Sequence, residues 1–334
     1  MDQKVNDFRY EDKNILITGG TGSLGQALTP LLLSKNVKKI KIYSRDEYKQ
    51  YVMKKKFDND KLEFYIGDIR DKDRLIKACN NIDCIIHAAS IKHVPSCENN
   101  PMEAIKTNIF GSQNVIEAAS KNLVKKVIGV STDKAVSPIN FYGHTKAIME
   151  KLFINANNYY TRFSCVRYGN VVGSRGSVIP FFKKVAKEGK KFPLTDKKMT
   201  RFWITLDQAA NFVLASSEKM QGQEIFIPKL PVMKITELAK AIKEDAEFEK
   251  IDIRQGEKLH ESLIGFEESC NVIKYDDFYK IYYGEYPKSW ENKRQFIYAS
   301  NTTENILSIE EMRKLLWKLK ILWMQVAEKW RMRN

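Results

Sequence analysis

The sequence lacks an apolar run of about 18 residues, the length that a membrane-spanning helix needs. Its first residues, MDQKVNDFRYEDK, are polar and lack the apolar stretch of a signal peptide. The five cysteines are scattered and form no CxxC pair, which argues against a disulfide framework and a structural zinc site. The four histidines also lack the spacing of metal ligands. We therefore expect a soluble, cytoplasmic protein with reduced thiols and no metal ion.

Negative charge is in short supply, because 56 Lys and Arg residues stand against 41 Asp and Glu residues and leave a net charge of +15. Such an excess suits an anionic partner such as nucleic acid, a membrane surface or a phosphorylated small molecule. The basic clusters at 38–41, at 54–56 and near the end of the chain do not form one stripe with interleaved aromatic residues. We interpret most of the excess as solvated lysine and expect neither nucleic acid nor a membrane as partner.

Apolar strands and helical segments alternate through the first half of the chain. The strands are expected in KNILITGG, KKIKIYS, LEFYIGD, DCIIHAA, KKVIGVS and RFSCVRYGN, with helical stretches such as DKDRLIKACNN and MEAIKTNIFGSQNVIEAASKN between them. Strands that alternate with helices over roughly 160 residues predict an α/β fold with a parallel, doubly wound sheet.

The alternation becomes less regular after Asn170, which indicates a smaller second domain. We expect the first domain at residues 1–170 plus about 202–222, and the second at 171–201 and 223–334. The final residues begin with a capping box at Ser308 and Glu311 and continue as a long basic helix. Packing on its own domain, subunit association and membrane-surface attachment all remain open for this helix.

A glycine-rich turn follows the first strand in TGGTGSLG and places Gly19, Gly22 and Gly25 between a strand and a helix. Glycines let the backbone approach a pyrophosphate, and the helix amino terminus offers unpaired N–H groups. The turn therefore predicts nucleotide binding. An ordinary tight turn is the alternative.

The end of the second strand, in YSRDEYKQ, is expected to reach the adenosine ribose of a dinucleotide. An acid at this place pairs with the ribose hydroxyls of NAD, whereas an arginine accommodates the extra phosphate of NADP. Here Ser44 and Arg45 come first and Lys49 follows at helical spacing, while Asp46 leaves NAD as the alternative. We favour NADP.

The stretch VSTDKAVSPINFYGHTK contains a Tyr-x-x-x-Lys pair that a helix places on one face. A neighbouring ammonium favours the phenolate of a tyrosine, so Tyr142 and Lys146 can remove a hydroxyl proton while a hydride leaves for nicotinamide. Together with the glycine turn, this pair resembles the extended branch of the short-chain dehydrogenase/reductase superfamily. The resemblance implies a Rossmann-type domain with a smaller α/β substrate-binding domain, and a buried Asn108 near the tyrosine.

Four motifs in order, STDKAVSPINFYGHTK, RYGNVVGSRGSVIPFF, MTRFWIT and GEKLHESLI, resemble the inverting UDP-N-acetylglucosamine 4,6-dehydratases. The resemblance covers about residues 12 to 310 and implies a UDP-N-acetylglucosamine substrate, an NADP that is regenerated each turnover, and a homo-oligomer. Asp133 would protonate the departing 6-hydroxyl, and Lys134 would remove the carbon 5 proton. For that role Lys134 must be neutral part of the time, and we expect burial near Lys146 and the cofactor to depress its pKa. Two alternatives stay open: a UDP-sugar 4-epimerase or non-inverting dehydratase, and a non-catalytic NADP-sensing protein.

The expected site residues fall into three groups. The catalytic group is Thr132, Asp133, Lys134, Tyr142 and Lys146. The cofactor-binding group is Gly19, Thr21, Gly22, Ser23, Leu24, Gly25, Ser44, Arg45, Lys49, Asp68, Ile69, Ala88, Ala89, Lys92, Asn108, Tyr142 and Lys146. The substrate-binding group, which the resemblance implies, is Lys92, Asn170, Arg175, Ser177, Val178, Arg201, Arg254 and Glu257.

Overall fold

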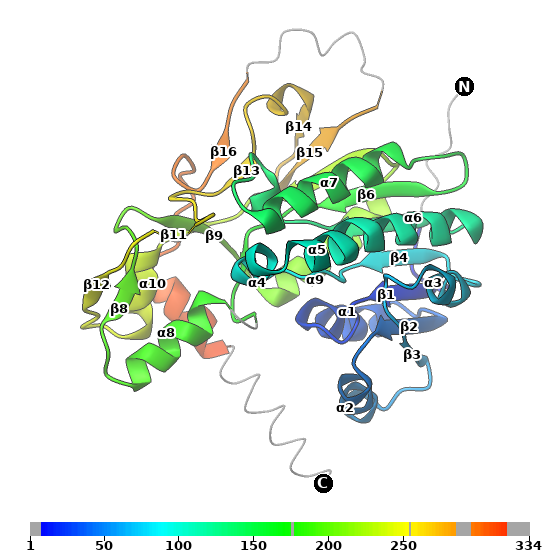
Figure 1. Ribbon diagram of the computed structural model, residues 1–334, viewed down its shortest axis with the longest axis horizontal. Helices are drawn as coiled ribbons and strands as arrows, with labels where there is room; N and C mark the ends of the chain where they lie inside the picture. Colours follow the sequence, from blue (N-terminus) through cyan, green and yellow to red (C-terminus); the bar gives the residue numbers. More distant parts are fainter. Residues whose placement is uncertain (1–7, 175–176, 254, 285–294, 319–334) are drawn as a thin grey trace.

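The computed structural model of the protein describes residues 8–174, 177–253, 255–284 and 295–318 (Figure 1). A large sheet forms the centre of this described part. In chain order its strands are β1 (Asn14–Thr18), β2 (Lys39–Ser44), β3 (Leu62–Ile66), β4 (Cys84–His87), β5 (Lys126–Val130), β6 (Arg162–Val166), β10 (Glu224–Pro228), β14 (Val272–Lys274) and β15 (Phe278–Tyr282). Their spatial order is β14-β15-β10-β6-β5-β4-β1-β2-β3. The strands from β3 to β6 run parallel, as expected; β10 adds another parallel strand beside β6, and β15 and β14 are antiparallel to their neighbours.

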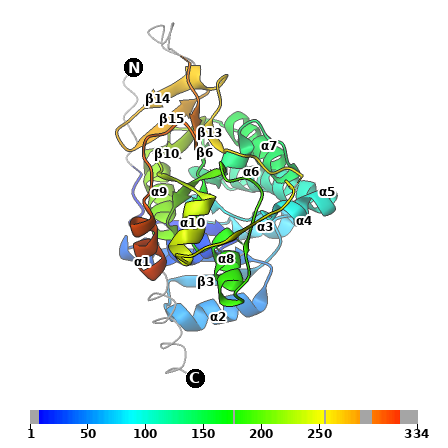
Figure 2. The ribbon, with the colours of Figure 1, turned by 90° about the vertical axis from the view of Figure 1, so that its left-hand side faces the viewer.

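Helices cover both faces of this sheet. Figure 2 shows α1 and α9 on one side of the strands and α3, α6 and α7 on the other. These helices are α1 (Ser23–Ser34), α3 (Lys72–Ala78), α6 (Gly111–Lys121), α7 (Phe141–Asn155) and α9 (Leu206–Lys219), with α2 (Glu47–Phe57), α4 (Val94–Asn99) and α5 (Pro101–Ala104) beside them. The doubly wound α/β architecture predicted from the alternation of strands and helices is confirmed.

A smaller lobe packs beside the carboxyl ends of the parallel strands and has its own apolar core (Figure 1). Phe182, Phe192, Trp203 and Leu238 are among its fully buried residues. Its elements are α8 (Val178–Lys187), α10 (Ile235–Ile242), β7 (Asn170–Val171), β8 (Phe192–Leu194), β9 (Thr200–Ile204), β11 (Val232–Lys234) and β12 (Phe248–Lys250). A short antiparallel pair, β13 (Ser262–Ile264) and β16 (Tyr298–Ala299), lies near the cleft described below.

The division between the two parts differs from the expectation at residues 223–334. Strands β10, β14 and β15 fall in that range but extend the large sheet. The reason is that β10 is buried along its whole length, and β15 pairs with it through five residues. Residues 102–122, expected as one helix, contain a π-helical turn at Ile105–Phe110.

The capping box expected at Ser308 and Glu311 is confirmed, because each backbone N–H donates to the side chain of the other residue. Met312 and Leu316, in the helical residues 309–318 that follow, are buried in the core of the smaller lobe. The rest of the expected terminal helix lies outside the described residues. Within the described part of the chain, no helix combines the length and apolarity needed to cross a membrane.

Candidate active site

The glycine turn after β1 brings the backbone close to neighbouring strands and leaves no room for side chains. Gly19 has a φ of +68°, and a Cβ atom there would lie 2.9 Å from the Ala89 backbone. A Cβ atom on Gly25 would lie 2.1 Å from the carbonyl oxygen of Gly20. Gly22 forms the N-cap of α1 without a side-chain hydrogen bond. The helix amino terminus therefore meets the turn with its N–H groups available to an anion.

A cleft of about 1230 Å³ extends from this turn across the carboxyl ends of the strands to the smaller lobe. Such a place is the usual ligand site of an open parallel sheet. Most of the expected residues line it: Gly19, Thr21, Gly22, Ser23, Leu24, Ser44, Arg45, Lys49, Asp68, Ile69, Ala88, Ala89, Lys92, Thr132, Asp133, Lys134, Tyr142, Asn170, Ser177, Val178, Arg201 and Glu257. Gly25, Asn108 and Lys146 do not line it, and Arg175 and Arg254 lie outside the described residues.

Basic groups line the cleft where β2 ends. The backbone N–H of Lys49 donates to Asp46 Oδ1 at 2.9 Å, and Lys49 Nζ lies 2.5 Å from Asp46 Oδ2. These hydrogen bonds from Lys49 hold the pKa of Asp46 below its usual value. Arg45 is exposed on the cleft, with its Nη1 atom 3.8 Å from Asp68 Oδ2. The carboxylate of Asp46 is thus engaged in capping α2, while two cations remain beside it.

Asp68 and Asn108 are held by hydrogen bonds within the protein. Asp68 accepts three hydrogen bonds from Arg70, which lower its pKa although burial acts in the opposite direction. Asn108 lies in the π-helical turn and is buried. Its amide exchanges hydrogen bonds with the backbone of Ile91 and donates to Thr145 Oγ1 at 3.0 Å. It therefore connects the loop after β4 to helix α7 and does not face the cleft.

Tyr142 and Lys146 lie in the first turns of α7, which Asn140 caps by accepting from the N–H of Gly143. Burial raises the pKa of Tyr142 to about 12, while the Lys134 charge and a hydrogen bond with Thr132 oppose the rise. Lys146 is buried, its Nζ lies 2.8 Å from Met149 Sδ, and burial lowers its pKa to about 8. The cation that favours the Tyr142 phenolate in this structure is Lys134, where the sequence indicated Lys146.

Asp133 and Lys134 form a short 3₁₀ turn directly after β5. Asp133 Oδ1 accepts from Thr132 Oγ1 and from Lys134 Nζ, both at 3.0 Å. Asp133 Oδ2 is buried and has no hydrogen-bond partner among the described residues.

The pKa of Lys134 is raised in this geometry, contrary to the expectation of a depressed pKa. Its Nζ lies 3.0 Å from Asp133 Oδ1 and 3.2 Å from Glu261 Oε1. Burial lowers its pKa, but these two carboxylates outweigh burial and raise it above the usual value. The expectation considered burial alone, whereas Asp133 has the larger opposing effect and Glu261, which the local sequence around Lys134 does not reveal, adds a second one.

The expected substrate contacts lie on the lobe side of the cleft. Arg201 is buried, and its guanidinium donates to the backbone carbonyls of Thr200, Lys258 and Leu259. Glu257 Oε2 accepts from Thr195 Oγ1 at 3.0 Å. Lys92, another expected substrate contact, instead follows β4 of the large sheet, and burial lowers its pKa. In the described part of the chain, no group of three or more His, Cys, Asp or Glu residues is arranged to hold a metal ion.

Comparison with known proteins shows the family to which the chain belongs. The model of the polysaccharide biosynthesis protein family matches residues 15–283. The chain belongs to this family. A UDP-N-acetylglucosamine 4,6-dehydratase (inverting) of Campylobacter jejuni is 54% identical over 279 residues, which are 81% of this chain and 83% of that protein. A UDP-glucose 4-epimerase of Rickettsia canadensis is 41% identical and covers 93% of this chain and 97% of its own.

Solved structures give the same assignment of fold. The X-ray structure of Pen from Bacillus thuringiensis has a TM-score of 0.86 and 38% identity, and it covers 93% of this chain and 99% of its own. DesIV, a dTDP-glucose 4,6-dehydratase from Streptomyces venezuelae, has a TM-score of 0.68 at 22% identity, covering 74% of this chain and 86% of its own. That second likeness shows the fold alone.

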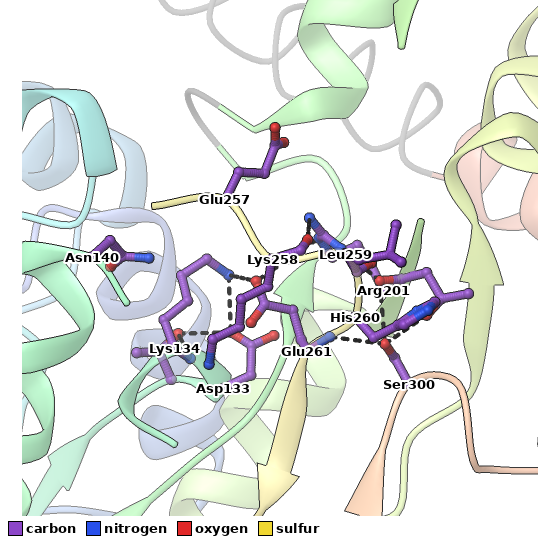
Figure 3. A network of polar contacts seen from close by, with 12 residues as sticks. Asp133, Lys134, Asn140, Arg201, Glu257, Lys258, Leu259, His260, Glu261 and Ser300 are labelled. Carbon is purple, nitrogen blue, oxygen red and sulfur yellow. Dashed lines mark hydrogen bonds and ion pairs between the residues drawn. The ribbon is translucent and has the colours of Figure 1, made fainter. Parts of the chain in front are cut away.

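Sequence reasoning missed two charged residues in this member of the polysaccharide biosynthesis family. Figure 3 shows Glu261 and Lys258 beside the Asp133–Lys134 pair, on the segment that also carries Glu257. Glu261 is buried and lines the cleft, and Lys258 Nζ donates to the carbonyl of Val136 at 2.6 Å. Both stand in the motif GEKLHESLI, but spacing within that motif does not show that they meet a loop more than a hundred residues earlier.

Proposed function

We propose that this protein is a UDP-N-acetylglucosamine 4,6-dehydratase that inverts carbon 5 and forms UDP-2-acetamido-2,6-dideoxy-β-L-arabino-hex-4-ulose. The Asp133–Lys134 pair carries the proposal, because it places an acid and a base beside Tyr142 in one cleft. The relative of that name at 54% identity supports it. The elimination of water needs such a pair, and a 4-epimerase does not.

A nicotinamide dinucleotide fits the sheet side of the cleft. The turn has no side chain at Gly19, Gly22 and Gly25, and this leaves space for a pyrophosphate at the amino terminus of α1. Arg45 and Lys49 favour NADP over NAD, since Asp46 is engaged as a helix cap. A nicotinamide held there would supply a hydride acceptor for oxidation at carbon 4 and a hydride donor for reduction at carbon 6.

Tyr142 removes the proton of the 4-hydroxyl in the first step. Burial favours its neutral phenol, so the nearby charge of Lys134 and the hydroxyl of Thr132 matter for forming the phenolate. Lys146, buried one helical turn further on, sits where it can add a second positive charge to the same face of α7.

The elimination then needs a neutral Lys134 and a protonated Asp133. Transfer of one proton from Lys134 Nζ to Asp133 Oδ1, along their 3.0 Å hydrogen bond, produces both at once. The Lys134 amine takes the carbon 5 proton, which the new carbon 4 ketone has made acidic, and Asp133 gives its proton to the departing 6-hydroxyl as water forms. Carbon 5 later receives a solvent-derived proton on the opposite face, and the overall change is the loss of one water molecule.

A UDP-sugar 4-epimerase is the second candidate, because the Rickettsia relative of that name covers nearly the whole chain. In that reaction Asp133 and Lys134 would have no proton to move.

We also propose that the protein is a homo-oligomer, and this proposal rests on the sequence resemblance.

The experiment is NMR of the purified protein with UDP-N-acetylglucosamine in deuterium oxide, first without added cofactor. We expect a 6-methyl, 4-keto sugar of L-configuration with deuterium at carbon 5. A 4-epimer would support the second candidate, and a D-configured keto sugar would contradict the role of Lys134. No reaction even with added NADP would contradict the proposed function.

A further inference from the structure

Glu261 is a buried carboxylate that spans the two parts of the cleft. It belongs to the segment beside the smaller lobe, but its Oε1 atom lies 3.2 Å from Lys134 Nζ on the loop after β5 and 4.0 Å from Arg201 Nε. Its side chain is only 3% exposed. Its Oε2 atom is buried and has no hydrogen-bond partner among the described residues. Burying a carboxylate with an oxygen that lacks a hydrogen-bond partner costs folding free energy, so a functional role for this residue would explain its burial.

The backbone of Glu261 is fixed by a set of hydroxyl groups. Its N–H donates to Ser300 Oγ at 3.0 Å, and the N–H of Ser300 donates to its carbonyl at 2.8 Å. Ser300 Oγ lies 2.7 Å from Thr200 Oγ1, which lies 2.7 Å from His260 Nδ1 (Figure 3). These contacts fix the backbone position from which the carboxylate reaches Lys134.

Two further hydrogen bonds join the segment before Glu261 to the loop between β5 and α7, which carries Asp133 and Lys134. Lys258 Nζ donates to the carbonyl of Val136, and Asn140 Nδ2 donates to the carbonyl of Gly256 at 2.8 Å. Asn140 is also the N-cap of α7, which carries Tyr142. The position of Glu261 relative to Lys134 is therefore set by connections on both sides of the cleft.

We propose that Glu261 is a positioning residue for the elimination: it shares the Lys134 ammonium with Asp133, and it is the counter-ion of that ammonium after Lys134 has taken the carbon 5 proton and before Asp133 has given its own proton to the 6-hydroxyl. The inference rests on the proposed function and adds a residue to it. Without Glu261, the ammonium would at that stage have no carboxylate partner, because Asp133 is still protonated. With Glu261, Asp133 can be the acid while Lys134 keeps its orientation.

The titratable groups that face Lys134 come from four segments. Asp133 precedes it in the same turn, Tyr142 lies on α7, Arg201 lies on β9, and Lys258 and Glu261 lie on the segment before β13. Asp133 and Glu261 raise the pKa of Lys134, and Arg201 lowers it. Replacing Glu261 by a neutral isostere must therefore lower the pKa of Lys134.

The test is Glu261→Gln, read by the pH dependence of acetic anhydride labelling at Lys134 in the protein as purified. The Lys134 side chain is 22% exposed on the cleft, so a small reagent can reach it, and mass spectrometry of its peptide gives the midpoint. We expect the midpoint to fall by at least about one pH unit, which makes labelling about tenfold faster at a fixed pH. An unchanged midpoint would overturn the inference.

Glu257→Gln is the matched control, because Glu257 lines the cleft on the same segment but pairs with Thr195. This control should leave the Lys134 midpoint where it is, and an equal shift there would also overturn the inference. Glu261→Asp keeps the charge on a shorter side chain. It should keep the midpoint close to that of the unmodified protein while slowing deuterium entry at carbon 5, and a fall as large as that of the Gln variant would count against a charge effect.

Turnover provides the second readout. In Glu261→Gln, the rise of carbon 5 exchange with pH should move to lower pH along with the labelling midpoint. If the unmodified protein forms no keto sugar but the midpoint still falls in the variant, the proposed function fails and the contact of Glu261 with Lys134 stands. If the unmodified protein turns over and the midpoint does not move, the inference alone fails.

Discussion

Asp133 is a buried carboxylate with one oxygen engaged and the other without a hydrogen-bond partner in the described part of the chain, as expected of an acid that donates to a substrate hydroxyl. Asp133→Asn keeps its shape but has no proton of suitable acidity to give. We expect cofactor content to stay the same and formation of the keto sugar to fall by about 10²- to 10⁴-fold, the usual contribution of general acid catalysis. NMR of the product measures the rate. Asp196→Asn, at an exposed acid of the smaller lobe, is the control, and near-normal dehydration in Asp133→Asn would contradict the assigned role.

Arg45 makes the second prediction at this scale. It is exposed just after β2, beside Asp46, which is the N-cap of α2. An extra ribose phosphate at this place would contact the Arg45 cation. Arg45→Ala should weaken NADP binding by about tenfold, a single charge-assisted contact, and leave NAD binding unchanged. Titration of both cofactors by protein fluorescence tests this, with Lys54→Ala on the exposed side of α2 as the control. An equal loss of affinity for NADP and NAD would show that Arg45 does not contact the ribose phosphate.

Single residues were predictable where the chemistry is local in sequence. Gly19, Asp133 and Tyr142 sit in short motifs whose spacing places them at one edge of a parallel sheet, and all three line the cleft. Glu261 was not predictable, because nothing in its neighbourhood indicates burial or a contact with Lys134. The pKa of Lys134 was mispredicted because burial alone was considered, without the opposing charges of Asp133 and Glu261.

Between elements, His87 joins β1, β4 and α6 in the core. Its Nδ1 lies 2.7 Å from Thr18 Oγ1 and its Nε2 lies 3.1 Å from Ser112 Oγ. Ser112 already donates its proton to the carbonyl of Asn108, so the ring donates from Nε2 and accepts at Nδ1. Burial, with a smaller effect of the Lys146 charge, lowers the pKa of His87 to about 3.

This histidine makes the fold sensitive to acid. As the pH falls below the unfolded value of 6.5, the unfolded chain binds a proton that the folded chain does not, so stability is lost between there and about 3. At about pH 5 the loss is about 2 kcal/mol relative to about pH 8. We expect His87→Gln to reduce the difference in unfolding free energy between those two pH values by about that amount, measured by urea titration. An unchanged difference would mean that His87 is not buried neutral.

Among the elements, β1 to β6 were predictable because each is an apolar run with a turn signal after it. The π-helical turn at Ile105–Phe110 was not, because one extra residue in a helix barely alters the apolar spacing. The pairing of β15 with β10 was also beyond the sequence, since an aromatic-rich run does not say which of two lobes it joins.

At the scale of the whole molecule, the net charge of +15 affects how the protein associates with charged ligands and does not determine its fold. Arg201, Lys92 and Lys134 line the cleft together with carboxylates, so the attraction of a diphosphate comes from the excess positive charge of the whole chain. We expect kcat/KM for the nucleotide sugar to fall about tenfold between about 0.05 and about 0.5 M salt, with kcat little changed, because the salt screens that charge. Steady-state kinetics in sodium chloride checks this. A salt-independent kcat/KM would mean that the excess is only solvated lysine.

The order of the large sheet also bears on how copies of the chain meet one another. A sheet that ended at β10 would present a fully buried, apolar strand as an open edge for a neighbouring molecule to extend. The antiparallel ribbon of β15 and β14 occupies that edge and ends in a strand of only three residues. At the opposite end, β3 is half-buried and carries Glu63, which lies 3.8 Å from Lys39. A short strand at one end and a charged one at the other discourage edge-to-edge aggregation in a protein with so wide a sheet.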